Sequence, residues 1–296
     1  MSLNLPFRTI TERKSPIEIQ VQTTSVCNAN CIMCPYPTTS SNITQGRITE
    51  ELYKKIVDDC AVNEVRIFKP FLMNEPLLDS RIPRFIAYSR EKLPNAEISI
   101  STNGSHLKLE MAEKLAQCGI DEVWVNMPSV DSRRYNEITG LKHEDTINNI
   151  LNFQHLLTLS KSPTKLIISI VELSKKPNAT KSAKEYWENI GIHPIVTPFN
   201  NRGGHVSLEN DVKINPHNQK RICDRPFYKL YILFNGDVIL CSSDWNRKHI
   251  IGNVGISSIN EIWHSTDANK YREAMKEHNY NIAEICEQCS YNHLHA

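Results

Sequence analysis

Three cysteines near the start of the chain form its densest group of metal-ligating side chains. Cys27, Cys31 and Cys34 lie in the segment Cys-Asn-Ala-Asn-Cys-Ile-Met-Cys. Three thiolates can hold three irons of a 4Fe–4S cubane, and the fourth iron then has no protein ligand. The spacing therefore predicts an iron–sulfur site with one position open to an exogenous ligand. The alternative is a structural zinc site that borrows a distant fourth cysteine.

A second group of four cysteines lies in the last quarter of the chain. Cys223 precedes a predicted β-hairpin, Cys241 closes it, and Cys286 and Cys289 form a C-x-x-C pair. Four thiolates complete the ligand set of one 4Fe–4S cluster, so that cluster has no open iron and is suited to electron transfer. A zinc ribbon built from the same cysteines and hairpin is the alternative.

The composition narrows the class of protein. Lys and Arg number 34 against 33 Asp and Glu, a net charge of +1 that argues against a nucleic-acid binder or an electrostatic membrane anchor. No apolar run approaches the roughly 18 to 20 residues of a membrane span, and the N-terminus lacks a secretory signal, so we expect a cytoplasmic protein. Nine cysteines without such a signal favour metal ligation over disulfides. Cys60 and Cys118 lie on apolar helix faces, and we expect both to be buried core thiols.

Short apolar strands alternate with amphipathic helices between residues 17 and 200. The predicted strands are 17–22, 65–71, 97–101, 122–126, 165–171 and 193–198, and the predicted helices are 50–60, 82–92, 109–118, 146–159 and 179–190. Strict alternation indicates an α/β fold with a parallel sheet and right-handed crossovers. Six units are fewer than a closed eight-unit barrel needs, so the sequence predicts an open, partial barrel.

Polar residues follow most of these strands. The carboxyl ends of parallel strands meet at one edge of a sheet, where active groups are usually found. We therefore expect one rim to gather the residues that come after strands. These are the first cysteine group, Asn74, Glu75, Thr102, Asn103, Asn126, Asn201 and Arg202.

The chain divides into a large first module and a small second one. The second module contains a hairpin centred on Asn235-Gly236, a strong turn signal, and a helix predicted from Ile259 to about Lys276. The predicted boundaries are an N-terminal extension at 1–16, the partial barrel at 17–204, a polar linker at 205–221, a cysteine-bearing α+β module at 222–290 and a tail at 291–296.

The first cysteine group, together with the segment Phe-Leu-Met-Asn-Glu-Pro at 71–76, resembles the radical S-adenosylmethionine (SAM) superfamily. The resemblance implies a partial (β/α)6 barrel and a 4Fe–4S cluster whose open iron chelates the amino and carboxylate groups of SAM. In this superfamily an aromatic residue usually precedes the third cysteine and lies against the adenine. Met33 stands there in this chain and keeps an apolar contact.

The same resemblance assigns further residues to the cofactor. Asn74 and Glu75 match the end of a Gly-Gly-Glu-Pro-like segment, where a carboxylate facing the methionyl ammonium forms a charge-assisted hydrogen bond. Ser101 and Asn103 match a ribose-contacting strand end, and Asn126 after the next strand completes the predicted cofactor-binding set. The alternatives without a cofactor are a helix N-terminal glutamate beside a proline and a plain turn at 101–104.

The second cysteine group resembles the auxiliary-cluster module of the same superfamily in its short form, the twitch domain. The longer form, SPASM, uses more cysteines and often holds two auxiliary clusters. The resemblance implies one auxiliary 4Fe–4S cluster bound by Cys223, Cys241, Cys286 and Cys289, and therefore two clusters in the whole chain.

One partial barrel with one twitch domain resembles aminocyclitol dehydrogenases of the 2-deoxy-scyllo-inosamine type. This implies an oxidoreductase in which a 5′-deoxyadenosyl radical takes hydrogen from a small polar, cyclitol- or sugar-like natural-product intermediate, and the auxiliary cluster accepts the second electron. Arg202 is the candidate catalytic residue, and its high pKa favours anchoring the substrate oxygen over deprotonating it. A surface loop arginine is the alternative.

Three other functions stay open at this stage. An epimerase needs a hydrogen donor, and the C-terminal cysteines are already used as ligands. A peptide cross-linking enzyme often has an N-terminal leader-binding domain, whereas 16 residues precede the first predicted strand. A non-catalytic iron–sulfur protein is the third. The expected partners are a small-molecule or peptide substrate and a reducing protein such as flavodoxin or ferredoxin.

Overall fold

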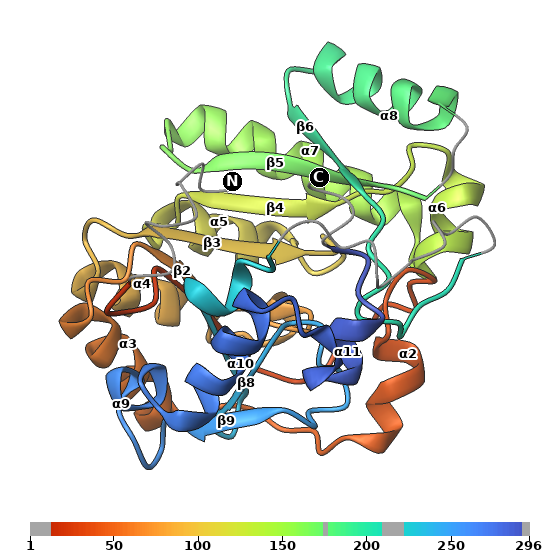
Figure 1. Ribbon diagram of the computed structural model, residues 1–296. Helices are drawn as coiled ribbons and strands as arrows, with labels where there is room; N and C mark the ends of the chain where they lie inside the picture. Colours follow the sequence, from red (N-terminus) through yellow and green to blue (C-terminus); the bar gives the residue numbers. More distant parts are fainter. Residues whose placement is uncertain (1–12, 174–176, 209–221, 292–296) are drawn as a thin grey trace.

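The fold is organised around one long, curved sheet. The computed structural model describes residues 13–173, 177–208 and 222–291. Within these residues nine strands form a single sheet in the order β6-β5-β4-β3-β2-β1-β7-β8-β9 (Figure 1). The first six strands are parallel, and each lies beside its neighbour in the chain. They are β1 (Glu18–Val21), β2 (Ile67–Lys69), β3 (Glu97–Thr102), β4 (Glu122–Asn126), β5 (Lys165–Glu172) and β6 (His193–Pro198).

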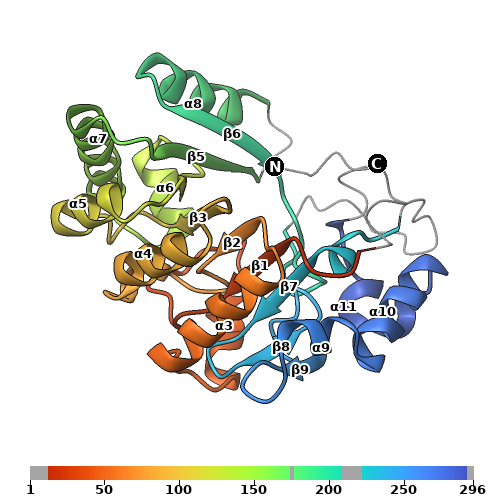
Figure 2. The ribbon, with the colours of Figure 1, turned by 90° about the vertical axis from the view of Figure 1, so that its left-hand side faces the viewer.

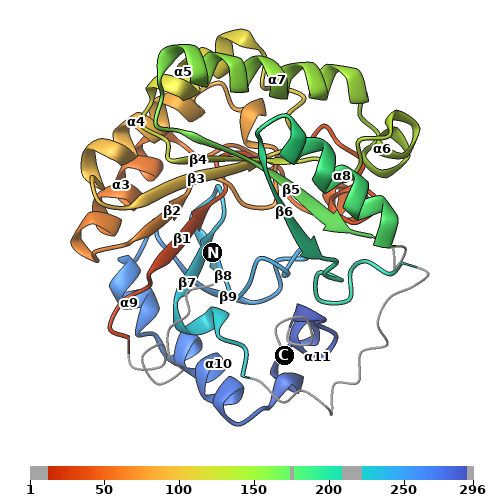
Figure 3. The same cartoon turned by 90° about the horizontal axis from the view of Figure 1, so that it is seen from above.

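Helices cover the convex face of this sheet, as Figure 3 shows from above. They are α3 (Glu50–Val62), α4 (Ile82–Lys92), α5 (Leu109–Gln117), α6 (Ser132–Thr139), α7 (His143–Ser160) and α8 (Pro177–Asn189). The alternation of parallel strands and covering helices, without closure of the sheet, is the α/β partial barrel that the sequence predicts. None of the helices described is long and apolar enough to cross a membrane.

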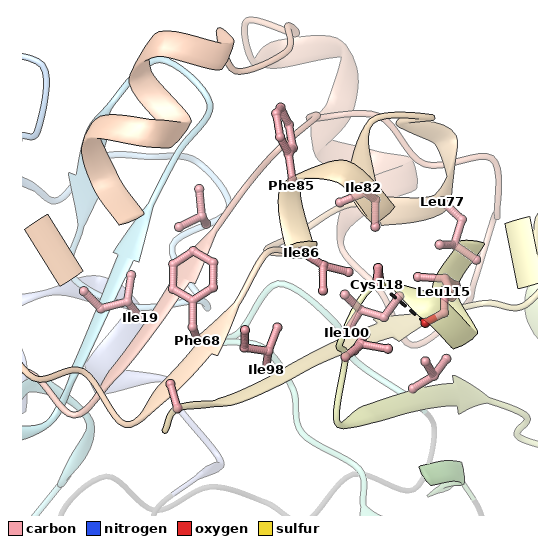
Figure 4. Close-up of a cluster of buried hydrophobic side chains, with 14 of the residues drawn as sticks. Ile19, Phe68, Leu77, Ile82, Phe85, Ile86, Ile98, Ile100, Leu115 and Cys118 are labelled. Atoms are coloured by element: carbon pink, nitrogen blue, oxygen red, sulfur yellow. Dashed lines mark hydrogen bonds between the residues drawn. The ribbon is translucent and has the colours of Figure 1, made fainter. Parts of the chain in front are cut away.

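The strands bury most of their apolar side chains on their outer face. Ile19, Phe68, Ile98 and Ile100 pack under the helices in one core (Figure 4). Cys60 and Cys118 belong to the same core, as predicted. Successive side chains of a strand point to opposite faces, so the residues between these apolar positions face the concave side. That side is therefore richer in polar residues, although Ile167 and Tyr231 also line it.

The concave face includes a buried group of charges. Glu18 of β1 is 2% exposed, and its carboxylate lies 3.3 Å from Lys69 Nζ on β2 and 3.0 Å from Lys229 Nζ. Gln20 donates a hydrogen bond of 2.7 Å to the same carboxylate. Burial opposes the charged form of Glu18, but the two lysines lower its pKa to about 2. The carboxylate therefore stays ionised inside the partial barrel.

The C-terminal module extends the sheet of the barrel. Strand β7 (Lys229–Ile232) pairs in parallel with β1, and β8 (Asp237–Ile239) and β9 (Ile250–Asn253) continue the sheet in antiparallel fashion. Gly236 in the predicted hairpin turn has a φ of +90°, which a glycine adopts without strain. Asp59 of α3 accepts a 2.6 Å hydrogen bond from Ile259 N, so the module also contacts the helical layer (Figure 2).

Three local expectations need correction. The single helix predicted over 259–276 is wrong, because Ser265 caps a second helix by accepting a hydrogen bond from Ala268 N. Two helices, α6 and α7, separate β4 from β5, whereas one was predicted. Strand β9 was not predicted. The remaining short elements are α2 (Tyr36–Thr39), α9 (Ile259–Trp263), α10 (Thr266–Lys276), α11 (Glu284–Glu287) and the 3-10 turns Ser40–Asn42, Pro76–Leu78, Arg225–Phe227 and Tyr280–Ile282.

The loop after β6 docks on the C-terminal cysteine pair. Asn201 is buried and makes three hydrogen bonds there: its N to Ser290 Oγ (2.9 Å), its Nδ2 to Gln288 O (2.7 Å), and its Oδ1 from Ser290 N (2.9 Å). A Cβ on Gly204, whose φ is +87°, would stand 2.9 Å from the Gln288 Cβ. Gly203 and Gly204 therefore allow this loop to approach the segment around Ile285 and Gln288 closely. The domain boundaries stay predictions, and residues 209–221 of the predicted linker lie outside the described residues.

Gly204→Ala is expected to lower the thermal unfolding temperature (Tm) by at least about 3 °C more than Gly191→Ala does, because roughly 1 kcal/mol shifts Tm by 2–4 °C at this size. Gly191 is the matched control: its φ is also positive, at +76°, but nothing lies within 4 Å of an added Cβ. The measurement is anaerobic calorimetry of the cluster-loaded chain. Equal Tm shifts for both variants would contradict the docking role of Gly204.

Candidate active site

One cavity of about 390 Å³ at the carboxyl ends of the strands collects every residue predicted for the first cluster and its cofactor. Its lining includes all the predicted iron ligands and cofactor-binding residues of the first site, together with the rim residue Thr102 and the candidate catalytic Arg202. The predicted set is Cys27, Cys31, Met33, Cys34, Asn74, Glu75, Ser101, Asn103 and Asn126. The expected convergence on one rim is therefore confirmed for these residues, but not for Asn201, whose side chain binds the backbone of Gln288 and Ser290 instead.

The first cysteine loop is held by two neighbouring segments. Asn30 N donates to Thr139 O (2.8 Å) and Ile32 N to Ile138 O (2.9 Å), so the end of α6 fixes the backbone on both sides of Cys31. On the other side, Asn103 Nδ2 donates to Asn28 Oδ1 at 2.9 Å. The loop consequently has a defined conformation in which its thiols face the cavity.

The thiols of this loop lie in a poorly solvated place. Burial raises the pKa of Cys27 to about 11 and that of Cys31 to about 12, and the other thiols and Glu75 act in the same direction. A bound cation offsets the cost of ionising these buried thiols, because iron binds them as thiolates. No three His, Cys, Asp or Glu side chains in the described residues are grouped to hold a single metal ion. Cubane ligands bind separate irons and need not meet at one point. The donor set therefore fits a 4Fe–4S cluster.

Glu75 is a buried carboxylate at the centre of the rim. It is 2% exposed and accepts hydrogen bonds from Asn103 N (2.7 Å), Leu77 N (3.1 Å) and the Thr102 hydroxyl. Burial raises the pKa of Glu75 to about 7, although these donors act to lower it. No Lys, Arg or His in the described part of the chain forms an ion pair with it. A methionyl ammonium would supply the missing positive charge, and we propose that Glu75 binds this ammonium.

Asn74 has an unused donor beside Glu75. Its Oδ1 accepts from Leu72 N at 2.8 Å, whereas its buried Nδ2 has no hydrogen-bond partner. Met73 has a φ of +54°, a conformation that normally favours glycine and that fits the glycines of the resembled segment. The strained turn presents Asn74 to the cavity, and its free amide suits the carboxylate end of SAM.

The other proposed cofactor residues already bond to each other. Asn126 Nδ2 donates to Ser101 Oγ at 3.0 Å, and both side chains line the cavity. Asn103 Oδ1 accepts from Ser105 N (2.9 Å) and Ser105 Oγ (2.6 Å), so it positions the loop as well as lining the site. Ser101 and Asn126 keep free hydrogen-bonding capacity for a diol, and Met33 supplies an apolar wall for adenine.

The second cysteine group encloses a separate small cavity. Cys223, Cys241, Cys286 and Cys289 all line it. Backbone N–H groups already point at two sulfurs, from Ser243 to Cys241 and from Tyr291 to Cys289, each at 3.4 Å. Burial raises the pKa values of Cys223, Cys286 and Cys289, as in the first group. Four thiols around one cavity, two of them with backbone N–H donors, fit a fully ligated cluster.

Two arginines stand between the cysteine groups. Arg202 lines the first cavity, and although burial lowers its pKa, the thiols of Cys34, Cys241 and Cys289 act in the opposite direction. Arg202 is therefore within electrostatic range of both groups. Arg225 lines both cavities. Burial acts to lower the pKa of Arg225 as well, but the thiols and tyrosines around it raise that pKa well above its ordinary value.

Sequence reasoning missed several residues of the cavity. Arg225, Lys229 and Tyr231 line it from the second module, because β7 adds to the sheet beside β1. The available signal was the segment Cys-Asp-Arg-Pro-Phe, in which the arginine follows a proposed ligand by two residues. The sequence of this segment does not show toward which cavity the Arg225 side chain points.

A wider cavity of about 1180 Å³ extends along the concave face from the first one. The two cavities share Phe71, Ser101 and Arg202. The wider one reaches Glu122 and Lys165, the first residues of β4 and β5, so it leads to the opposite end of the barrel. It offers space for a substrate larger than the cofactor cavity admits.

Comparison with known proteins agrees with this site. Residues 21–160 match the model of the radical SAM superfamily, and residues 223–290 match an iron–sulfur cluster-binding domain of the SPASM type. The chain belongs to the radical SAM superfamily and carries a C-terminal SPASM-type domain. It is thus a radical SAM oxidoreductase whose cofactors are SAM and 4Fe–4S clusters, as the sequence predicts.

Two kinds of relative stand out among the similar proteins. An S-adenosyl-L-methionine-dependent 2-deoxy-scyllo-inosamine dehydrogenase from Niallia circulans is 24% identical over 92% of both chains. The crystal structure of BtrN in complex with AdoMet and 2-DOIA superposes with a TM-score of 0.61, at 21% identity over 92% of each chain. Streptococcus suis SuiB bound to its precursor peptide SuiA has a TM-score of 0.71 at 14% identity, over 88% of this chain and 67% of that one. The solved structures support the fold.

Glu75→Gln is expected to weaken SAM binding roughly ten- to hundredfold, because a charge-assisted hydrogen bond contributes about 1.5–3 kcal/mol. In the unsubstituted chain the affinity should fall as the pH is lowered from about 7 to about 5.5, since protonation of Glu75 competes with the ammonium. The variant should lack this pH dependence. Equilibrium dialysis on cluster-loaded protein measures both, with the exposed Glu110→Gln as control. Unchanged affinity in Glu75→Gln would contradict the assignment.

The two cysteine groups predict two separable clusters. Anaerobic reconstitution should give about eight irons per chain, and simultaneous replacement of Cys27, Cys31 and Cys34 by alanine should leave about half of them. Iron and sulfide analysis measures this, with the core variant Cys118→Ala as the control that keeps all of its iron. Loss of all iron from the triple variant, or zinc in the unsubstituted protein, would contradict two independent clusters.

Proposed function

We propose that this protein oxidises a carbon–hydrogen bond of a small polar molecule, most simply an alcohol to a ketone. When bound, SAM and the two clusters supply a 5′-deoxyadenosyl radical that abstracts hydrogen and an acceptor for the second electron. The observation that carries the proposal is the position of Arg202, within electrostatic range of thiols from both cysteine groups. A substrate at Arg202 is then close to both. The dehydrogenase relative, which aligns with 92% of this chain, supports the same reaction class.

The residues around Arg202 indicate how a substrate is held. Its guanidinium can donate to the substrate oxygen and remains protonated, so it anchors the hydroxyl and stabilises charge on it. The oxidation removes one hydrogen atom, one electron and one proton, and the proton passes to water in the wider cavity. The polar concave face, with Lys69, Ser99 and Glu122, suits a substrate rich in hydroxyl groups. We propose a cyclitol- or sugar-like intermediate, with flavodoxin or ferredoxin as electron donor.

The epimerase alternative lacks a thiol donor in this geometry. The cysteines that line the two cavities all belong to the two cysteine groups. Cys118 lies in the outer core (Figure 4), where its thiol donates to Leu115 O at 3.3 Å. Cys60 belongs to the same core and is completely buried. Neither reaches a substrate at Arg202 without rearrangement of the core.

Peptide modification is the second candidate. The observation that favours it is the wider cavity of about 1180 Å³, which reaches Glu122 and Lys165 at the opposite end of the barrel. The similarity in fold to SuiB, solved with its precursor peptide, is compatible with this use. A peptide would be anchored through the same Arg202.

Reaction in deuterium oxide distinguishes these functions. Dehydrogenation should give a product two mass units lighter that reacts as a ketone, with substrate hydrogen in 5′-deoxyadenosine and no solvent deuterium at the reacting carbon. The measurement is mass spectrometry of aminocyclitol, sugar alcohol and peptide candidates, with the Glu75→Gln variant as control. An isobaric product carrying one deuterium would establish the epimerase instead, and a lighter cross-linked peptide would establish the second candidate.

A further inference from the structure

Arg225 of the second module lines both the cofactor cavity and the four-cysteine cavity. It begins the 3-10 turn Arg225–Phe227, two residues after Cys223. It lines the cofactor cavity together with Glu75 and Arg202, and it lines the four-cysteine cavity together with Cys241. Its guanidinium therefore separates the proposed substrate site from the proposed auxiliary cluster.

The guanidinium is held in one place by two contacts. Its NH1 group lies 3.4 Å from Cys241 Sγ, as a donor. Its central carbon lies 3.7 Å from the ring centroid of Tyr291, a close cation–π contact. Tyr291 in turn donates its backbone N–H to Cys289 Sγ at 3.4 Å. Arg225 and Tyr291 therefore link Cys241 Sγ to Cys289 Sγ through two hydrogen bonds and one cation–π contact.

A fixed positive charge at a ligand sulfur changes the redox properties of a cluster. Reduction adds one negative charge to an already anionic set of four thiolates and the metal core. Hydrogen bonds to the sulfurs and nearby charge are the means by which proteins shift cluster potentials. At hydrogen-bonding distance in a poorly solvated cavity, this stabilisation of the reduced state is only weakly screened.

We propose that Arg225 raises the reduction potential of the auxiliary cluster and so makes it an acceptor for an electron that leaves the substrate site. The role as electron acceptor rests on the proposed function, whereas the effect of Arg225 on the potential does not. Arg225 is a positioning residue in this role, since it acts through Cys241. Arg202, by contrast, lies on the barrel side and is assigned to the substrate.

Arg272 provides a matched control in the same module. It is 9% exposed, stacks on Trp263 with a distance of 3.9 Å to the ring centroid, and donates to Pro226 O at 2.9 Å. It is therefore a buried, aromatic-stacked arginine near the same turn. Thiols are not among the causes that shift its pKa, which burial alone lowers to about 10.

The test is a redox titration of the full-length, two-cluster protein followed by electron paramagnetic resonance, without substrate. The auxiliary signal is the one that SAM does not alter. Arg225→Gln should lower the equilibrium constant for its reduction more than about tenfold, which is 59 mV for a one-electron couple. Arg225→Lys should recover at least half of that shift. Arg272→Gln should change the constant less than about twofold, and the SAM-sensitive signal should keep its potential.

Several results would overturn the proposal. One is an unchanged auxiliary potential in an Arg225→Gln protein that retains all its iron. Another is an equal shift in Arg272→Gln. If Arg225→Gln does not fold, Tyr291→Leu removes the ring that holds the guanidinium while keeping the backbone N–H to Cys289. Its reduction constant should then fall between about twofold and tenfold, and an unchanged value would refute the role of Arg225. Because no turnover is measured, these outcomes are independent of whether the substrate is an alcohol.

Discussion

Anions buried next to one another need a cation or hydrogen-bond donor beside each of them, and the interior of this protein depends on that constraint. Glu18 is balanced by Lys69 and Lys229. Glu75 accepts hydrogen bonds from three donors, but no cation in the described part of the chain pairs with it, and burial raises its pKa to about 7. The sulfurs depend on the same constraint, because iron is the positive charge that allows seven half-buried thiols to ionise.

The sheet creates the polar space in which these groups lie. A strand of a typical parallel sheet is apolar on both faces, because helices cover both. Here helices cover only the convex face, and the strands alternate between apolar and polar residues, as in Glu-Ile-Ser-Ile-Ser-Thr of β3. The concave face is left for cofactor, substrate and the Glu18 charge group. Incomplete closure of the barrel is therefore linked directly to function.

Two contacts unite the barrel and the second module into one site. The first is the parallel pairing of β7 with β1, which brings Arg225, Lys229 and Tyr231 to the cavity. The second is the docking of the loop after β6 on the C-terminal cysteine pair through Asn201, with Gly203 and Gly204 allowing the approach. Arg202 lies within this docked loop. The distance between the two cysteine groups is thus set by backbone contacts that involve no cofactor.

The sequence by itself determined the composition of the site. The spacing of Cys27, Cys31 and Cys34 and of the second group identifies two iron–sulfur ligand sets, since ligand type and local spacing are properties of short segments. Alternating strands and helices predict the parallel sheet, and sheet topology then brings Glu75, Asn103 and Asn126 to one rim. Even Arg202 is placed correctly in the cavity, although its role is still a proposal.

Only the tertiary structure decided how the two modules meet. Nothing in the local pattern of the hairpin at Asn235-Gly236 shows that its first strand joins β1 in parallel, because strand pairing across more than 200 residues depends on long-range packing. The same is true of Arg225, whose spacing from Cys223 is visible in the sequence but whose contact with Cys241 and Tyr291 is not. The break between α9 and α10 was likewise missed, because the hydroxyl of Ser265 could equally have faced solvent. Side-chain direction is set by packing, and packing exists only in the assembled fold.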